Sequence, residues 1–248
     1  MRSWTAIFLT GLLTQLFANP AVAAPADVDR AGERSRMVDA IVRMVTDTRR
    51  QTGVAALSPR VEAALRSVPR HLFVTHDEAP LAYANHPLPI GEGQTISQPY
   101  MVALMTELAA PEAGDRILEV GTGSGYQAAV LAELAGQVET IEIIEPLART
   151  AAARLAERGR HNVRVHVGDG WHGVPEHGPY DAIVVTAVAP SLPPPLVEQL
   201  RPGGRIVIPI GPEHGTHELR VYTLDAAGGV SERSVLPVRF VPLTRSPD

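Results

Sequence analysis

A glycine-rich turn between a strand and a helix constrains this chain more than any other feature. The apolar residues 116–120 predict a short buried strand, GTGSG at residues 121–125 predicts a tight turn, and residues 126–134 predict a helix. Glycines let such a turn bring backbone N–H groups against a ligand, and the N-terminus of the helix adds partial positive charge. The turn therefore predicts a ligand site at the carboxyl end of this strand.

The same alternation of strand and helix continues along the chain. Strands are predicted at residues 138–143, 163–167, 182–186 and 205–208, with helices at residues 147–158 and 196–200. Strands that alternate with helices form a parallel sheet that is covered on both faces. Two further strands, residues 218–224 and 234–241, are separated by a stretch that opens with the turn-like DAAGG. We therefore expect an α/β, Rossmann-like fold, in which a mostly parallel sheet ends in antiparallel C-terminal strands.

The part of the chain before this sheet is expected to be an extension of helices and loops. Apolar residues at helical spacing predict an amphipathic helix over residues 28–50. Ser58 and Pro59 predict the N-cap and first residue of a second helix, which runs to about residue 66, and another helix should follow Pro99. Prolines punctuate residues 68–93, which predicts loops. GQTISQPYM, at residues 93–101, is expected to form neither a strand nor a helix core.

Composition excludes several classes of function. The formal net charge of −5 provides no basic face for nucleic acid, so no nucleic-acid partner is expected. The chain has no cysteine, which excludes disulfides, thiolate zinc sites and cysteine nucleophiles. Its nine histidines, including His172, His177, His214 and His217, show neither HExxH nor HxH spacing. We expect them to be surface or loop residues, and we expect no metal site.

The first residues have the pattern of an export signal. Arg2 precedes a mostly apolar run at residues 6–17, and AVA at residues 21–23 is an A-x-A cleavage pattern. The apolar run is too short to span a bilayer as a mature helix, so no stable membrane insertion is expected. The alternative is an N-terminal extension that is not a signal.

An acidic residue stands close to the end of each of the first three strands of the sheet. Glu119 lies two residues before Gly121, where a carboxylate would repel a pyrophosphate but would suit the ammonium group of S-adenosylmethionine. Nicotinamide enzymes also prefer G-x-G-x-x-G, whereas the spacing here is G-x-G-x-G. Glu142 ends the second strand, where doubly wound folds place an acid that binds ribose hydroxyls. Asp169 and Gly170 follow the third strand, on the side expected for the adenine.

Each of these features also has an interpretation without a ligand. Strand-to-helix turns use glycine for backbone reasons alone, and Asp-Gly is a common turn pair. Glu142 could be a solvated acid at a strand end, and Glu139 or Glu145 nearby could bind the ribose hydroxyls in its place. Three acids at the ends of three successive strands nevertheless form a set, and together they favour S-adenosylmethionine as the cofactor.

Several stretches in continuous order resemble the protein-L-isoaspartate O-methyltransferase family. They are VPRHLFV, YANHPLPIG, GQTISQPYM, ILEVGTGSGYQAAVLAEL, GDGW, YDAIVVTA, PGGRIVIPIG and VRFVPLT, and the resemblance covers about residues 58–244. The glycine turn is shared by many methyltransferases, whereas the TIS-Q-P loop is close to diagnostic of this family. The resemblance implies methyl transfer from S-adenosylmethionine to the free carboxylate of isoaspartyl residues in damaged proteins and peptides. The methyl ester then collapses to a succinimide, which opens partly to normal aspartate.

The resemblance also implies roles for individual residues. The serine of the TIS motif, here Ser97, is treated as the active-site residue of the family. Thr95, on the cofactor side of the same loop, is expected to be a second catalytic residue. Cofactor contacts are expected from Ile96, Glu119, Gly121, Thr122, Gly123, Gly125, Tyr126, Glu142, Asp169, Gly170 and Thr244. A carboxylate with a pKa of about 4 is already ionised at neutral pH, so no general base or metal is required. Ser97 is therefore expected to position the carboxylate or the cofactor, and not to act as a covalent nucleophile.

These expectations divide the chain into three parts. Residues 1–23 are expected to be a signal peptide, residues 24–57 an N-terminal helical segment and residues 58–248 the methyltransferase domain. The mature protein is expected in the periplasm, with the cytoplasm usual for the family as the alternative. It is expected to be a monomer whose partners are isoaspartyl proteins and peptides. Two other functions stay open: a small-molecule carboxyl or oxygen methyltransferase, and an inactive cofactor-binding sensor.

Overall fold

The computed structural model describes residues 30–246, together with Met1, of the 248-residue chain. The expected signal peptide, residues 1–23, lies outside the described residues apart from Met1. Within residues 30–246, no helix combines the length and the apolar composition that crossing a membrane requires.

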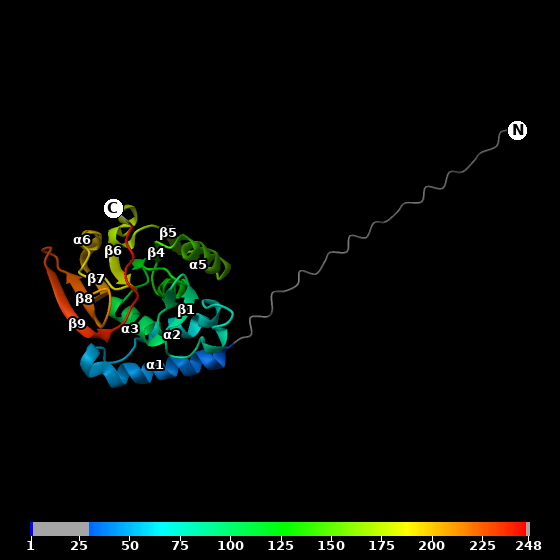
Figure 1. The fold of residues 1–248 in the computed structure, drawn as a ribbon, viewed down its shortest axis with the longest axis horizontal. Coiled ribbons are helices and arrows are strands. Elements are labelled where there is room, and N and C mark those ends of the chain that lie inside the picture. The colour runs from blue at the N-terminus through cyan, green and yellow to red at the C-terminus, as the bar shows by residue number, and fades with distance from the viewer. Residues whose placement is uncertain (2–29, 247–248) are drawn as a thin grey trace.

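A seven-stranded sheet forms the centre of the molecule (Figure 1). Its strand order is β5-β4-β3-β6-β7-β8-β9, and the first five strands in this order are parallel. β8 and β9 are antiparallel to their neighbours. The strands are β3 (Arg116–Val120), β4 (Gln137–Glu142), β5 (Val163–Val167), β6 (Tyr180–Val185), β7 (Leu200–Ile210), β8 (His217–Leu224) and β9 (Val230–Val238). The expected α/β architecture, including its antiparallel C-terminal strands, is confirmed.

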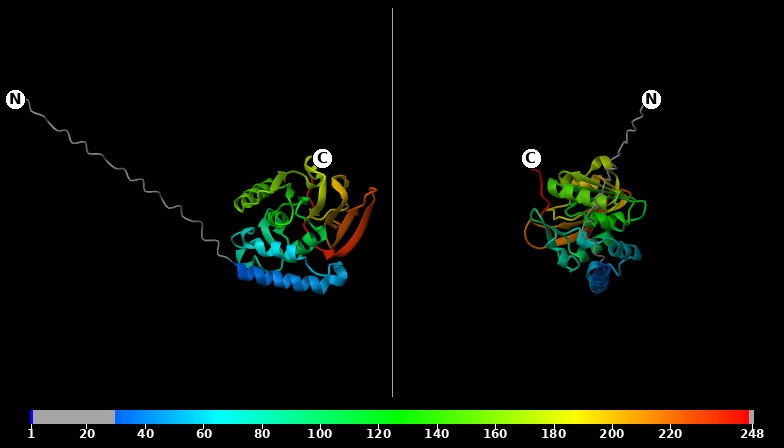
Figure 2. Two further views of the ribbon diagram at one scale, coloured as in Figure 1. Left: turned by 180° about the vertical axis from the view of Figure 1, so that it is seen from behind. Right: turned by 90° about the vertical axis from the view of Figure 1, so that its right-hand side faces the viewer.

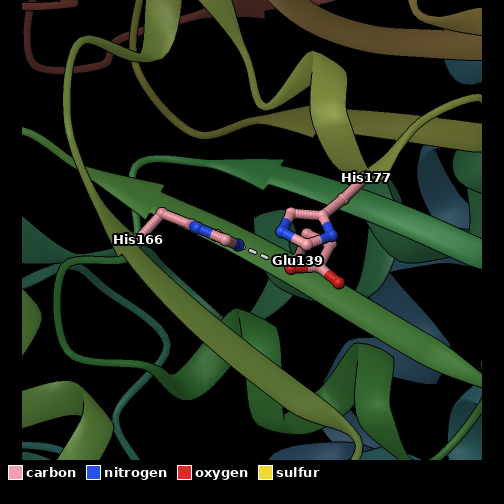
Figure 3. A group of neighbouring side chains, drawn as sticks. All are labelled: Glu139, His166 and His177. Atoms are coloured by element: carbon pink, nitrogen blue, oxygen red, sulfur yellow. Dashed lines mark hydrogen bonds and ion pairs between the residues drawn. The ribbon is translucent and has the colours of Figure 1, made fainter.

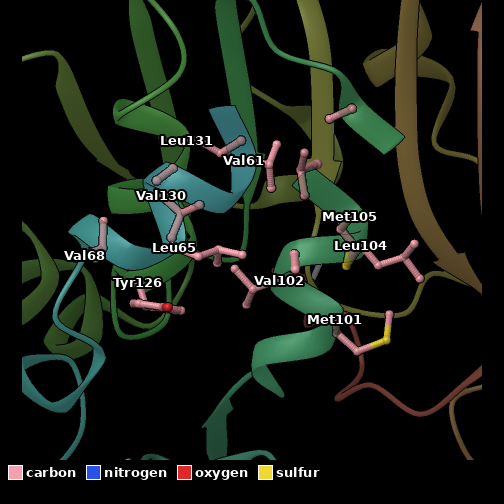
Figure 4. Close-up of a cluster of buried hydrophobic side chains, with 14 of the residues drawn as sticks. Val61, Leu65, Val68, Met101, Val102, Leu104, Met105, Tyr126, Val130 and Leu131 are labelled. Atoms are coloured by element: carbon pink, nitrogen blue, oxygen red, sulfur yellow. The ribbon is translucent and has the colours of Figure 1, made fainter. Parts of the chain in front are cut away.

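The longer helices pack on one face of this sheet. They are α1 (Ala31–Thr52), α2 (Pro59–Ser67), α3 (Pro99–Ala109), α4 (Tyr126–Ala132) and α5 (Glu145–Glu157). Their buried side chains form one apolar core with Ile117, Val184 and Val207 of the sheet. Figure 4 shows the part of this core where α2, α3 and α4 meet, around Leu65, Val102 and Leu131. Burial of these apolar side chains holds the N-terminal helices against the strands.

Shorter elements cover the opposite face of the sheet. Side chains alternate along a strand, so Leu118 and Ile183 point away from the first core. They form a second apolar cluster with Val174, Tyr180 and Leu196. Tyr180 begins β6, whereas Leu196 lies in α6 (Pro194–Glu198) and Val174 lies between the short 3₁₀ helices η3 (Gly170–His172) and η4 (Pro175–His177). The expectation that both faces are covered is therefore correct, but the elements on the second face are shorter.

α1 lies along the outside of the helical layer and reaches β9 at its C-terminal end. Figures 1 and 2 show it as a long helix along the lower side of the molecule. Nη1 of Arg233 in β9 donates a hydrogen bond of 2.7 Å to the carbonyl oxygen of Thr52. The hydroxyls of Thr48 and Tyr100 lie 2.8 Å apart, which joins α1 to α3. The helix predicted over residues 28–50 is confirmed, with slightly later bounds.

One prediction is wrong, because part of GQTISQPYM forms a strand. β1 (Leu88–Gly91) and β2 (Gln94–Ile96) make an antiparallel hairpin whose two turn residues have positive φ angles. Each strand buries only one apolar side chain deeply, Leu88 and Ile96, which is too few to show an alternating pattern in the sequence. The hairpin holds in place the short loop that connects β2 to α3.

Candidate active site

A cavity lies at the carboxyl ends of the parallel strands, the edge at which doubly wound α/β folds bind ligands. Its lining includes most of the residues predicted from the sequence: Thr95, Ile96, Ser97, Glu119, Gly121, Thr122, Gly123, Tyr126, Glu142, Gly170 and Thr244. We call this space the inner cavity. It encloses about 70 Å³.

The glycine turn brings the backbone unusually close to the neighbouring strands. Gly121 has a φ of 96°, and a Cβ atom there would lie 2.5 Å from Oγ1 of Thr186. The Thr186 hydroxyl lies 2.8 Å from the carbonyl oxygen of Gly121, to which it donates. A Cβ atom at Gly170 would lie 2.4 Å from Cγ1 of Val120. Gly125 does not line the cavity but ends the turn as the N-cap of α4, with a φ of 85°.

A chain of buried hydroxyls connects the turn to Glu119. Oγ1 of Thr122 lies 2.6 Å from Oγ1 of Thr140, which in turn donates to Oε2 of Glu119 at 2.5 Å. Glu119 is fully buried, and its Oε1 has no hydrogen-bond partner among the described residues. Burial raises the pKa of Glu119 to about 8, although the hydrogen bond from Thr140 opposes this effect and the charge of Glu142 adds to it. An unpaired carboxyl oxygen beside a cavity favours a ligand that donates a hydrogen bond or carries positive charge.

Glu142 holds the glycine turn from the adjacent strand. Its Oε2 accepts a hydrogen bond of 2.9 Å from the N–H of Gly123, and its Oε1 accepts one of 3.0 Å from the N–H of Ile144. The side chain also lines the inner cavity. Each carboxylate oxygen has more than one lone pair. Glu142 can therefore order the turn and still accept hydrogen bonds from hydroxyl groups of a ligand.

Asp169, a predicted adenine contact, does not line the inner cavity. Its side chain accepts hydrogen bonds from the N–H groups of Trp171 and Ser246 and from Nε of Arg245. Burial by itself would raise the pKa of Asp169, but these hydrogen bonds outweigh it and lower the pKa. The guanidinium of Arg245 also lies over the ring of Trp171, 4.4 Å from its centroid. Asp169 thus anchors the C-terminal segment next to the cavity.

Ser97 and Thr95 lie between the inner cavity and a second, wider space. That space, which we call the outer groove, encloses about 540 Å³. Most of its lining is apolar, with Met44 of α1, Met101 of α3 and Phe240 after β9 as examples. Four residues line both spaces: Thr95, Ser97, Thr186 and Val241. Thr95 and Ser97 of the TIS loop therefore lie at the junction of the two spaces.

Sequence reasoning missed Thr186 as a residue of the site. Thr186 directly follows β6, and its place at the carboxyl end of a predicted parallel strand was the available signal. Val241, Pro242 and Leu243 line the inner cavity beside the predicted Thr244. Backbone hydrogen bonds of 2.9 Å hold this segment, from the N–H of Val188 to Val241 and from the N–H of Leu243 to Val188. No local pattern could show this return, because the bonds join residues far apart in the sequence.

The prediction that the histidines are surface or loop residues is wrong for His217. This residue begins β8 and is buried, and its Nδ1 accepts a hydrogen bond of 3.1 Å from the N–H of Phe240. It thereby satisfies a backbone donor where the chain leaves β9. His214 and His172 are exposed as expected, and His177, which ends η4, is partly buried.

Comparison with known proteins identifies the family. Residues 42–247 match the family described as protein-L-isoaspartate(D-aspartate) O-methyltransferase. A Polaromonas protein named protein-L-isoaspartate O-methyltransferase 2 is 57% identical over 208 residues, which cover 84% of this chain and 99% of that protein. A Cupriavidus necator protein named protein-L-isoaspartate O-methyltransferase 1 is 53% identical over 237 residues, covering 94% of this chain and 92% of that protein.

Solved structures show the same fold. A structure described as protein-L-isoaspartate O-methyltransferase superposes with a TM-score of 0.74 at 26% identity, covering 84% of this chain and 65% of the other. A Plasmodium falciparum protein, solved in complex with S-adenosyl-L-homocysteine, superposes with a TM-score of 0.72 at 23% identity, covering 86% and 99%. From the family match and the identity to these relatives, we conclude that the chain belongs to the protein-L-isoaspartate O-methyltransferase family.

Proposed function

We propose that the protein transfers a methyl group from S-adenosylmethionine to the free carboxylate of L-isoaspartyl residues in damaged proteins and peptides, and so begins their repair through a succinimide. The observation that carries this proposal is the position of Ser97 and Thr95, which line both the inner cavity and the outer groove. Membership of the family supports the same reaction.

The residues of the inner cavity fit S-adenosylmethionine, which supplies an electrophilic methyl group when bound. The unpartnered Oε1 of Glu119 would accept a hydrogen bond from the ammonium group on the methionine part of the cofactor. Glu142, at the end of β4, would accept hydrogen bonds from the ribose hydroxyls. Gly121 and Gly170 both line the inner cavity, and a Cβ atom at either would clash with Thr186 or Val120, so only glycine lets the backbone take this path beside the ligand.

The outer groove fits a peptide that carries a carboxylate. Its volume and its apolar side chains give room for neighbouring residues of the peptide, and Arg239 in its lining attracts negative charge. A carboxylate at the junction is already ionised at neutral pH. The hydroxyls of Ser97 and Thr95 therefore have to orient it and do not have to remove a proton.

Methyl transfer from labelled S-adenosylmethionine to two peptides that differ only in isoaspartate versus aspartate tests the proposed reaction. We expect labelling of the isoaspartyl peptide alone. A small-molecule methyltransferase would label neither peptide but would methylate a small acid or hydroxyl compound. A sensor would bind the cofactor and label nothing. Either of these last two results overturns the proposed function.

The raised pKa of Glu119 predicts that cofactor binding releases a proton. At pH 7 a carboxyl group with a pKa of about 8 is about 90% protonated. A nearby ammonium group favours the ionised form, so binding should release up to about 0.9 proton. Titration calorimetry at pH 7, in buffers of different ionisation enthalpy, measures this number.

The Glu119→Gln variant is the matched control, because it keeps the shape and neutral charge of the protonated residue. The variant should still bind the cofactor, but binding should no longer release the proton that comes from Glu119. Equal proton release from the variant and the unaltered protein at pH 7 would contradict the assignment.

The Ser97→Ala variant tests the positioning role of the TIS loop. We expect near-normal affinity for the cofactor and a fall in kcat of at least about tenfold, because one hydrogen bond that orients the carboxylate is lost. Ser231→Ala, an exposed position on β9 outside both spaces, makes the same chemical change and should leave kcat unchanged. Normal turnover by Ser97→Ala would show that Ser97 does not position the reacting groups.

We also propose that residues 1–23 are an export signal and that the mature protein works in the periplasm. Support comes from Arg2, the apolar run at residues 6–17 and the AVA pattern at residues 21–23. N-terminal sequencing of protein from separated cell fractions should find Ala24 as the first residue of a periplasmic form. Ala23→Phe should block this processing, because the cleavage site needs small side chains. Unprocessed protein confined to the cytoplasm would refute the proposal.

A further inference from the structure

Three side chains from separate elements meet where η4 covers β4 and β5 (Figure 3). Glu139 lies in β4, His166 in β5, and His177 ends η4. Nε2 of His166 lies 2.6 Å from Oε2 of Glu139, and the rings of His166 and His177 have centroids 5.1 Å apart. One possible ligand atom from each residue lies within 4.8 Å of the other two. We call these three residues the Glu139 cluster.

The Glu139 cluster is separate from the proposed active site. None of its three residues lines the inner cavity or the outer groove. Side chains alternate along β4, so Thr140 and Glu142 point to the face of the glycine turn. Glu139 points to the opposite face, with Ile141 of the second apolar cluster. The methyltransferase reaction therefore gives no reason for the cluster.

The charge of Glu139 requires a positive partner. The residue is fully buried, and buried carboxylates are costly unless they are paired or coordinate a metal. Nη1 of Arg164 lies 3.9 Å from Oε1 of Glu139 and 3.2 Å from Nδ1 of His177. The simplest interpretation is an ion pair of Glu139 with His166 and Arg164. Nε2 of Gln137 also donates to Oε1 of Glu139 at 2.6 Å. The ring of His177, which Arg164 contacts, lies beside the same carboxylate (Figure 3).

We propose that Glu139, His166 and His177 form a binding site for a divalent transition-metal cation of the zinc type. Two imidazole nitrogens and one carboxylate oxygen are a set of donors that suits zinc and its neighbours in the first transition row. The side chain of Arg164 is 56% exposed, so it can move into solvent when a cation takes over its charge. Water would complete the coordination, because the two histidines are only partly buried.

Small movements of the side chains would bring the cluster into coordination geometry. Tetrahedral zinc with bonds of about 2.1 Å places its ligand atoms about 3.4 Å apart. The atoms of the cluster span 4.8 Å at most, and the partly buried imidazoles have freedom to rotate. A bound cation would join His166 to His177 across the segment that carries Asp169 and Gly170. Metal binding should therefore fix this segment against β4.

Titration calorimetry with zinc chloride, on tag-free full-length protein stripped with a chelator, tests the site. We expect one equivalent of zinc per chain. His177→Ala should weaken binding by more than about tenfold, since even outer-shell partners of metal ligands are worth 10–100-fold in affinity. His214→Ala, which removes an exposed histidine away from the cluster, should leave the affinity unchanged.

Arg164→Gln keeps the test decisive if His177→Ala disturbs η4. Removing the competing guanidinium should strengthen zinc binding, which damage to the fold would not do. Absorption spectra with cobalt, a zinc substitute, should show the visible bands of a low-coordinate site, and His177→Ala should lose them. The proposal is overturned if the unaltered protein takes up no stoichiometric zinc, if His177→Ala binds as tightly as His214→Ala, or if Arg164→Gln weakens binding.

Discussion

The glycine turn depends on β3 running between β4 and β6 in the interior of the sheet. The N–H of Gly121 donates to the carbonyl oxygen of Ile141 in β4, and the Thr186 hydroxyl after β6 donates back to Gly121. Glu142, at the end of β4, accepts from the N–H of Gly123. The ends of three parallel strands thus define where the backbone donors of the turn lie. A turn of the same sequence without these neighbours would not hold the same shape.

Two buried acids on neighbouring strands show how the surroundings decide the chemistry of a carboxyl group. Glu119 has one oxygen without a partner beside the inner cavity, and burial raises its pKa to about 8. Glu139, on the opposite face of the sheet, has His166 and Gln137 as hydrogen-bond partners. The first carboxyl group suits a cationic ligand within the methyltransferase site. The second suits a cation held between imidazoles.

The proposed site is assembled by elements that are distant in the sequence. The β1–β2 hairpin brings Thr95 and Ser97 to the sheet edge, and the C-terminal segment returns to the same edge beside Val188. Asp169 anchors the end of that segment through Arg245 and Ser246. The C-terminal segment and the TIS loop therefore both line the inner cavity. The wider outer groove leaves the other side of the TIS loop open to a peptide.

The sequence by itself determined the order of strands and helices, the glycine turn and the N-cap of α2, where Oγ of Ser58 accepts from the N–H of Val61 at 3.4 Å. These features depend on neighbours within a few positions, so local spacing reveals them. Only the tertiary structure decided that GQTISQPYM continues a hairpin, that Thr186 closes on Gly121 and that Asp169 pairs with the chain end. The same holds for the meeting of Glu139, His166 and His177. The spacing of apolar residues in the sequence shows which face of a helix or strand a side chain occupies. The contacts named above depend instead on which distant segments fold against that face.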